Sequence, residues 1–171
     1  MTEAGASPGM TTEPPRAGSL SGPVLVIGYG NPLRSDDGVG PAVAARLAGD
    51  PWLAGAEVRA EHQLTPELAL DASRTSLLVL VDAGTTEAPG EVSVRRLEPV
   101  ADGGTAWTHH LDPSALVGLA RELWGAAPPV VIVSIGPESL EMGEGLTDTV
   151  APAVPRAVDL IAAIVEAHRR A

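Results

Sequence analysis

Two adjacent carboxylates follow a strand-like run near the start of this chain. The aliphatic run 24–27 has the length and branched residues of a strand covered on both faces. It ends in a turn where Gly28 and Gly30 are expected to adopt backbone angles that a side chain would resist. Asp36 and Asp37 come next, directly before a helical segment. Ligands bind at the carboxyl edge of open α/β sheets, so these two side chains are in the right place for chemistry.

Three residues form a candidate site at that edge. The aliphatic strand 77–81 ends at Asp82, and His109 and His110 precede a further helix. We expect Asp37, Asp82 and His110 to leave the same sheet edge and to converge. Two carboxylates and one imidazole suit a divalent cation such as nickel or zinc. Three protein ligands would leave coordination positions open for water, a peptide carbonyl or groups from a partner.

Each of these residues also has an ordinary structural interpretation. One aspartate of the pair 36–37 can cap the following helix, and the other can favour its positive end. A cap and a site are also compatible, with Asp36 as the helix cap and Asp37 pointing across the sheet edge. Asp82 can close a turn through its own backbone, and the histidines can be loop residues. On spacing alone, the metal site and the structural roles are equally supported. Dinucleotide binding and serine hydrolysis are disfavoured, because neither the Gly-x-Gly-x-x-Gly spacing nor a Gly-x-Ser-x-Gly elbow occurs.

The composition narrows the class of protein. With 171 residues, 44% hydrophobic content and no phenylalanine, the chain fits one domain with an aliphatic core. The absence of cysteine excludes disulfides and thiolate metal sites. A net charge of -11, from 22 acidic and 11 basic residues, disfavours nucleic acid and anionic membranes as partners. No apolar stretch approaches the roughly twenty residues that span a bilayer, and no secretory leader is evident, so we expect a soluble, cytoplasmic protein.

The order of patterns predicts the fold. Residues 1–23 are rich in Gly, Pro, Ser and Thr and are interpreted as a flexible tail, and residues 24–171 as a single α/β domain. Strands and helices alternate, which predicts a three-layer sandwich with a mostly parallel twisted sheet and helices on both faces. The expected strands are 24–27, 56–60, 77–81, 90–97 and 130–135, and the expected helices are 41–47, 65–73, 113–123 and a terminal helix from about 148.

Several local features of these elements can be checked. We expect strand 90–97 at an edge of the sheet, with one solvated face. Thr65 and Asp112 are expected N-caps, each followed by a proline at the first helical position. Leu123 belongs to the predicted buried face of helix 113–123. Pro155 is a possible kink in the terminal helix, whose buried stripe is predicted as Val150, Val154, Val158, Ile161 and Val165.

The segment 28–40, which reads GYGNPLRSDDGVG, resembles the signature of the hydrogenase maturation endopeptidases. Two further blocks match in order, namely 80–83, and 137–141 with 145–147. Similarity thus extends from about residue 24 to the terminal helix. The resemblance implies an endopeptidase that removes the C-terminal extension of a nickel-iron hydrogenase large-subunit precursor after nickel has been inserted.

The resemblance also implies roles for individual residues. Asp37, Asp82 and His110 would contact the nickel held by the cysteines of the precursor, so that the substrate supplies the metal. Zinc or another divalent cation is an alternative occupant in the isolated protein. The cation would polarise the scissile carbonyl or activate water. Many members carry an Asp-Gly-x-Thr-like segment where this chain has residues 61–67; His62 and Gln63 are therefore candidates for substrate selection, with a plain loop role equally open.

Two other functions remain open at this point. The first is a non-catalytic metal- or precursor-binding accessory protein in hydrogenase assembly, which would check nickel loading with the same three residues. The second is a metallohydrolase acting on a small amide, which would need no precursor. Loss of cleavage with retained precursor binding in Asp37→Asn separates catalysis from an accessory role.

Overall fold

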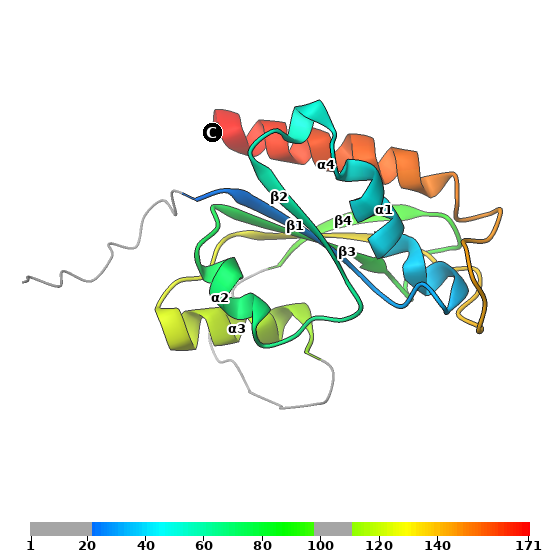
Figure 1. Cartoon of the computed structure of the whole chain (residues 1–171), viewed down its shortest axis with the longest axis horizontal. Helices are drawn as coiled ribbons and strands as arrows, with labels where there is room; N and C mark the ends of the chain where they lie inside the picture. The colour runs from blue at the N-terminus through cyan, green and yellow to red at the C-terminus, as the bar shows by residue number, and fades with distance from the viewer. Residues whose placement is uncertain (1–21, 98–110) are drawn as a thin grey trace, which may run out of the picture.

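The computed structural model describes residues 22–97 and 111–171, which form a sheet enclosed by two layers of helices (Figure 1). Within these ranges the strands lie in the order β2-β1-β3-β5-β4, and only β4 runs antiparallel to its neighbour. This confirms the predicted fold class. The strands are β1 Val24–Tyr29, β2 Ala56–Glu61, β3 Leu77–Ala83, β4 Val92–Leu97 and β5 Val130–Ile135. The helices are η1 Ser35–Gly38, α1 Val39–Leu47, η2 Pro51–Leu53, α2 Leu68–Ser73, α3 Pro113–Trp124 and α4 Ala153–Arg170.

Alternation along the strands divides the core between the two faces of the sheet. Valines such as Val26, Val79 and Val133 pack against α1 and α4, whereas Ile27, Leu80 and their neighbours pack against α2 and α3. The side chains of both sets are fully buried. Burial on both faces explains why the central strands read as continuous aliphatic runs. The predicted tail, residues 1–23, lies almost wholly outside the described residues.

Two glycines let α1 pack directly on the backbone of β1. A Cβ on Gly28 would lie 2.0 Å from the carbonyl oxygen of Gly40, and a Cβ on Gly40 would lie 2.4 Å from that of Tyr29 and 2.5 Å from that of Val81. Gly28 is thus required for close approach rather than for its backbone angles, which corrects the interpretation from sequence. At Gly30 that interpretation is correct, because its φ is +142°.

Replacing Gly40 by alanine should therefore disrupt the contact between helix and sheet. We expect the free energy of unfolding to fall by about 3 kcal/mol in urea denaturation, because the new methyl group would meet backbone oxygens that cannot move independently. Gly118→Ala is the matched control: this glycine lies within α3, and a Cβ there meets nothing within 4 Å. The control should be neutral or slightly stabilising. Equal losses in both variants would contradict the packing argument.

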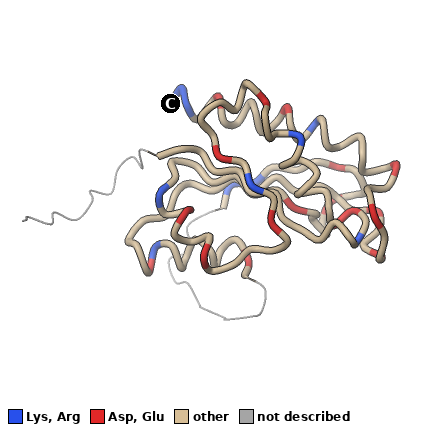
Figure 2. The backbone as a smooth tube through the Cα atoms, in the orientation of Figure 1, with Lys and Arg blue, Asp and Glu red and all other residues tan. Residues whose placement is uncertain are grey.

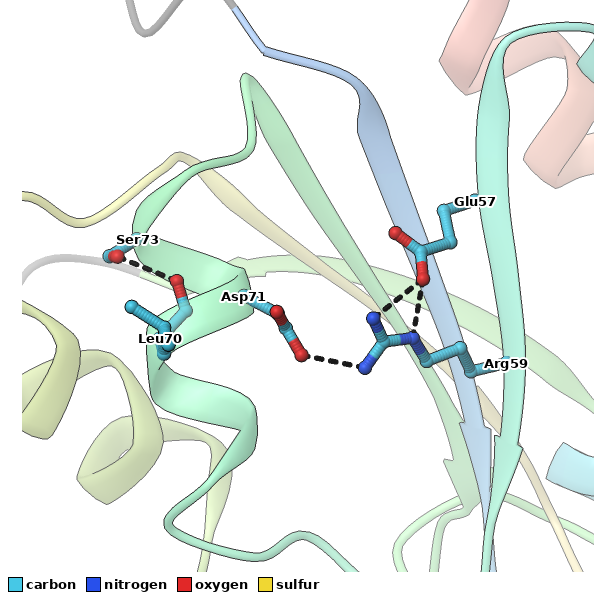
Figure 3. Close-up of polar contacts among 5 residues, drawn as sticks. All are labelled: Glu57, Arg59, Leu70, Asp71 and Ser73. Carbon is cyan, nitrogen blue, oxygen red and sulfur yellow. Dashed lines mark hydrogen bonds and ion pairs between the residues drawn. The ribbon is translucent and has the colours of Figure 1, made fainter.

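An ion-pair network connects the edge strand β2 to α2 (Figure 3). The Arg59 guanidinium donates to Asp71 Oδ2 at 2.7 Å and to Glu57 Oε1 at 2.7 Å. These side chains are 29–48% exposed, so each pair contributes less than about 1 kcal/mol.

The predicted N-cap at Thr65 is wrong. The helix α2 begins at Leu68 without a side-chain cap, and Thr65 instead closes the preceding turn through its carbonyl oxygen.

The other local predictions are mostly confirmed. Strand β4 lies at an edge, and Asp112 caps α3 by accepting a hydrogen bond from the Ala115 amide at 2.8 Å. Leu123 is 58% exposed, so its predicted burial is wrong; it lies in the last turn of α3. The sequence predicts that the terminal helix begins at about residue 148, but residues 148–152 form turns and α4 begins at Ala153. Pro155 consequently falls in the first turn of α4, where its missing N–H interrupts nothing.

The buried stripe of the terminal segment is confirmed at four of its five positions. Val150, Ile161 and Val165 are fully buried, Val158 is nearly so, and Val154 is half-buried against the same cluster. Among the described residues, no helix is both long and apolar enough to cross a bilayer.

Candidate functional site

The structure places Asp37 and Asp82 at the same edge of the sheet. β1 and β3 are neighbouring parallel strands; Asp82 lies at the carboxyl end of β3, and Asp37 lies in η1, which follows β1 and contacts β3. His110 is outside the described residues, so convergence of all three residues stays a prediction. Within 22–97 and 111–171, no three Asp, Glu or His side chains are grouped closely enough to hold a metal.

Asp37 is held by the turn that precedes it. Its Oδ2 atom accepts a hydrogen bond from the Asn31 amide at 2.9 Å, and the side chain is half-buried. Gly30 makes this arrangement possible, because a Cβ there would lie 1.9 Å from the carbonyl oxygen of Asp37. The glycine turn thus brings the backbone of Asp37 against the end of β1.

Both oxygens of Asp82 accept hydrogen bonds from hydroxyl groups on the flanking strands. Tyr29 on β1 donates to Oδ2 at 2.8 Å, and Ser134 on β5 donates to Oδ1 at 2.7 Å. Burial of Tyr29 raises the pKa of its phenol, and the negative charge of Asp82 raises it further. The phenol is therefore a neutral donor throughout the range of ordinary pH.

The sequence interpretation missed Tyr29 and Ser134. The alternation of side chains along a strand could have identified them. Tyr29 lies on the same face of its strand as Leu25 and Ile27, and Ser134 lies on the same face of its strand as Val130 and Ile132. Both therefore point to the face that Asp82 shares with Leu80. The missing information was the strand order, which puts β1 and β5 on the two sides of β3.

Asp36 has a structural role that differs from the predicted helix cap. Its side chain is fully buried and accepts bonds from the amides of Glu138, Ser139 and Thr147 at 2.8–3.0 Å, and from the Thr147 hydroxyl. Neither η1 nor α1 has a side-chain cap. Burial alone would raise the pKa of Asp36, but these hydrogen bonds outweigh it and lower the pKa below its usual value.

Backbone hydrogen bonds reinforce this connection between the first motif and the loop 136–147. The Ser35 amide donates to the Gly143 carbonyl at 2.8 Å, and the Gly143 amide donates to the Leu33 carbonyl at 2.9 Å. The Asp36 amide donates to the Ser139 carbonyl at 3.1 Å. Two of the blocks that carry the family resemblance are therefore in direct contact, and the loop 136–147 fixes the turn that holds Asp37.

The two candidates for substrate selection lie beside this site. His62 and Gln63 are exposed and follow β2, which runs parallel to β1 and ends at the same edge. The Gly30 amide donates to the Glu61 carbonyl at 3.0 Å, which connects their loop to the glycine turn. Their location is compatible with contact to a bound partner, and their role in selection stays a prediction.

Acidic residues surround this edge of the sheet. Figure 2 shows Asp and Glu positions gathered at the right of the view, where the loop 136–148 lies. That loop carries four acidic residues, Glu138, Glu141, Glu144 and Asp148. The aspartates of η1 add to them at the same edge. A negative field at the edge repels polyanions and favours the approach of cations.

The three-layer α/β fold of this chain is shared with solved maturation peptidases. The hydrogenase maturating endopeptidase HybD from E. coli is 25% identical, with a TM-score of 0.65 over 84% of this chain and 92% of that chain. A hydrogenase 2 maturation peptidase from Thaumarchaeota archaeon SCGC_AB-539-E09 is also 25% identical, with a TM-score of 0.66 over 84% and 98%. An endopeptidase from Escherichia coli is 26% identical, with a TM-score of 0.65 over 81% and 89%.

The family model described as hydrogenase maturation protease matches residues 62–164, more than half of the sequence. This chain belongs to the hydrogenase maturation protease family. No curated protein matches the sequence. The family resemblance found in the motifs is therefore confirmed, and a protease acting on a hydrogenase precursor follows from it.

Proposed function

We propose that this protein removes the C-terminal extension of a nickel-iron hydrogenase large-subunit precursor after nickel has been inserted. Family membership supports proteolysis of a hydrogenase precursor. The observation that carries the finer proposal is the placement of Asp37 and Asp82 at one edge of the sheet, at the ends of neighbouring strands. Two oxygen donors on a rigid sheet edge are suited to contact a cation carried by the substrate.

Asp37, Asp82 and His110 are proposed to contact the nickel of the precursor and thereby to recognise a completed metal site. In this scheme nickel belongs to the substrate, and zinc or another divalent cation is an alternative occupant of the site in the isolated protein. Carboxylate and imidazole ligands fit both metals. Once the precursor is bound, the cation can polarise the carbonyl of the peptide bond to be hydrolysed. The residues of this chain hold the precursor so that its metal and that carbonyl lie together.

The test compares nickel-loaded and nickel-free large-subunit precursors incubated with the purified protein. We expect truncation of the loaded form only, followed as a loss of C-terminal mass by intact mass spectrometry. Equal cleavage of both forms would contradict recognition through nickel. Stable binding of the loaded precursor without cleavage would instead support the non-catalytic accessory role. Cleavage of small amides with added zinc would favour an ordinary metallohydrolase.

A further inference from the structure

We propose that Tyr29 and Ser134 are positioning residues that orient the Asp82 carboxylate toward the metal of the precursor. This inference rests on the proposed function, because it concerns how Asp82 performs its part of nickel recognition. Neither hydroxyl is assigned a metal contact of its own. Each acts through Asp82, and the two come from different strands on opposite sides of it.

The sheet register brings the two hydroxyls to the level of Asp82. Ser134 is the direct partner of Asp82 in the pairing of β3 with β5. On the other side, Gly28 pairs with Val81, so the next residue of β1, Tyr29, reaches the level of Asp82. All three side chains extend from the same face of the sheet, since residues directly opposite one another on neighbouring strands share a face. The donors are thus fixed by backbone pairing rather than by loop conformation.

These two hydrogen bonds restrict rotation of the carboxylate. A carboxylate with one donor would still rotate about its Cβ–Cγ bond, but donors at 2.8 Å on Oδ2 and 2.7 Å on Oδ1 define the plane of the group. Each oxygen retains lone-pair capacity for a cation. Ser134 is buried and Tyr29 is half-buried, so water does not readily replace either donor. Groups that orient a metal ligand in this way typically change metal affinity or activity by 10–100-fold.

A purely structural role for the same bonds has a different consequence. If the hydroxyls served only to satisfy a half-buried carboxylate, their loss would weaken the fold and would affect loaded and nickel-free precursors alike. If they orient Asp82 toward the metal, their loss affects the loaded precursor selectively. The comparison of the two precursor forms therefore separates the two roles.

The experiment uses Tyr29→Phe and Ser134→Ala in the full chain, with kcat and KM measured on nickel-loaded precursor. Nickel-free precursor is added as a competitor, and its inhibition constant is measured. We expect kcat/KM to fall about tenfold in each variant, mainly through KM, with the inhibition constant unchanged within about twofold. The two variants remove donors on separate strands, so a folding failure in one leaves the other informative.

Ser73→Ala is the matched control. Ser73 is a buried serine on α2 whose hydroxyl donates to the Leu70 carbonyl at 2.7 Å, within its own helix (Figure 3). This variant should keep the wild-type kcat/KM. A wild-type protein that does not cleave loaded precursor would overturn the proposed function and this inference together. Wild-type cleavage with kcat/KM retained in both variants, or with the inhibition constant rising in parallel, would overturn this inference alone.

Discussion

Asp37→Asn is expected to lower the turnover of nickel-loaded precursor by about 100-fold or more while the protein keeps its stability. Asparagine removes the negative charge from the proposed metal contact. Its side-chain oxygen can still accept the bond that the Asn31 amide now donates to Asp37 Oδ2 at 2.9 Å. The turn should therefore keep its conformation. The measurements are the initial rate of precursor truncation and the midpoint of thermal unfolding.

The adjacent aspartate provides an internal comparison for that result. Asp36 is fully buried and its side chain is occupied by hydrogen bonds, so it cannot reach a substrate. We therefore expect the loss of turnover to be specific to the charge of Asp37, and a conservative change elsewhere in the turn should not reproduce it. Cleavage by Asp37→Asn at more than about a tenth of the wild-type rate would contradict a role for this carboxylate in the reaction. A large drop in the unfolding midpoint would indicate that Asp37 is structural.

Asp36→Ala is expected to lower the free energy of unfolding by about 4 kcal/mol. The substitution leaves the amides of Glu138, Ser139 and Thr147 without their acceptor and opens a cavity beneath the loop 136–147. A loss of this size is a large part of the roughly 5–15 kcal/mol that stabilises a typical domain. Urea denaturation measures it, and Asp50→Ala is the control, because that half-buried side chain accepts a single hydrogen bond, from the Trp52 amide. Similar losses in both variants would contradict the role of Asp36.

The contribution of Asp36 should also depend on pH. Its pKa in the folded protein lies below its usual value, so folding favours the ionised form. The resulting stabilisation is complete above the unfolded pKa, near 4, and is lost as the pH falls through the lower folded pKa. The difference in stability between wild type and Asp36→Ala should therefore shrink in acid. A constant difference from neutral pH to acid would indicate that packing, and not the charge, supplies the effect.

Local sequence patterns predict elements well here and predict side-chain roles poorly. Aliphatic runs and strand-end carboxylates are local features, and they place β1, β3 and the aspartates that follow them correctly. The role of Asp36 depends on Thr147, 111 residues further along the chain, and no local pattern contains that partner. The residues next to Asp36 favour a helix cap, but its carboxylate instead accepts hydrogen bonds from three amides of a distant loop, because buried amides require an acceptor.

Helix boundaries show the same limit. Thr65 and Pro66 have the residue types of a helix start, yet α2 begins at Leu68 because the preceding residues form a turn. By contrast, Asp112 and Pro113 carry an equivalent signal and do begin α3, with the aspartate side chain bonded to the Ala115 amide. The sequence alone does not distinguish these two cases, since both have a suitable cap followed by proline.

The distance along the chain between Asp36 and Thr147 sets the time at which the site can form during synthesis. The ribosome releases the first motif early, but the acceptor bonds that hold its turn need residues 138–147, which emerge more than 100 residues later. β5 directly precedes those residues, and its pairing with β3 brings them to the first motif, a contact between segments far apart in the sequence. A partly synthesised chain therefore carries Asp37 without the hydrogen bonds that fix its turn, and we expect competence to process a precursor only once the last third of the protein has folded.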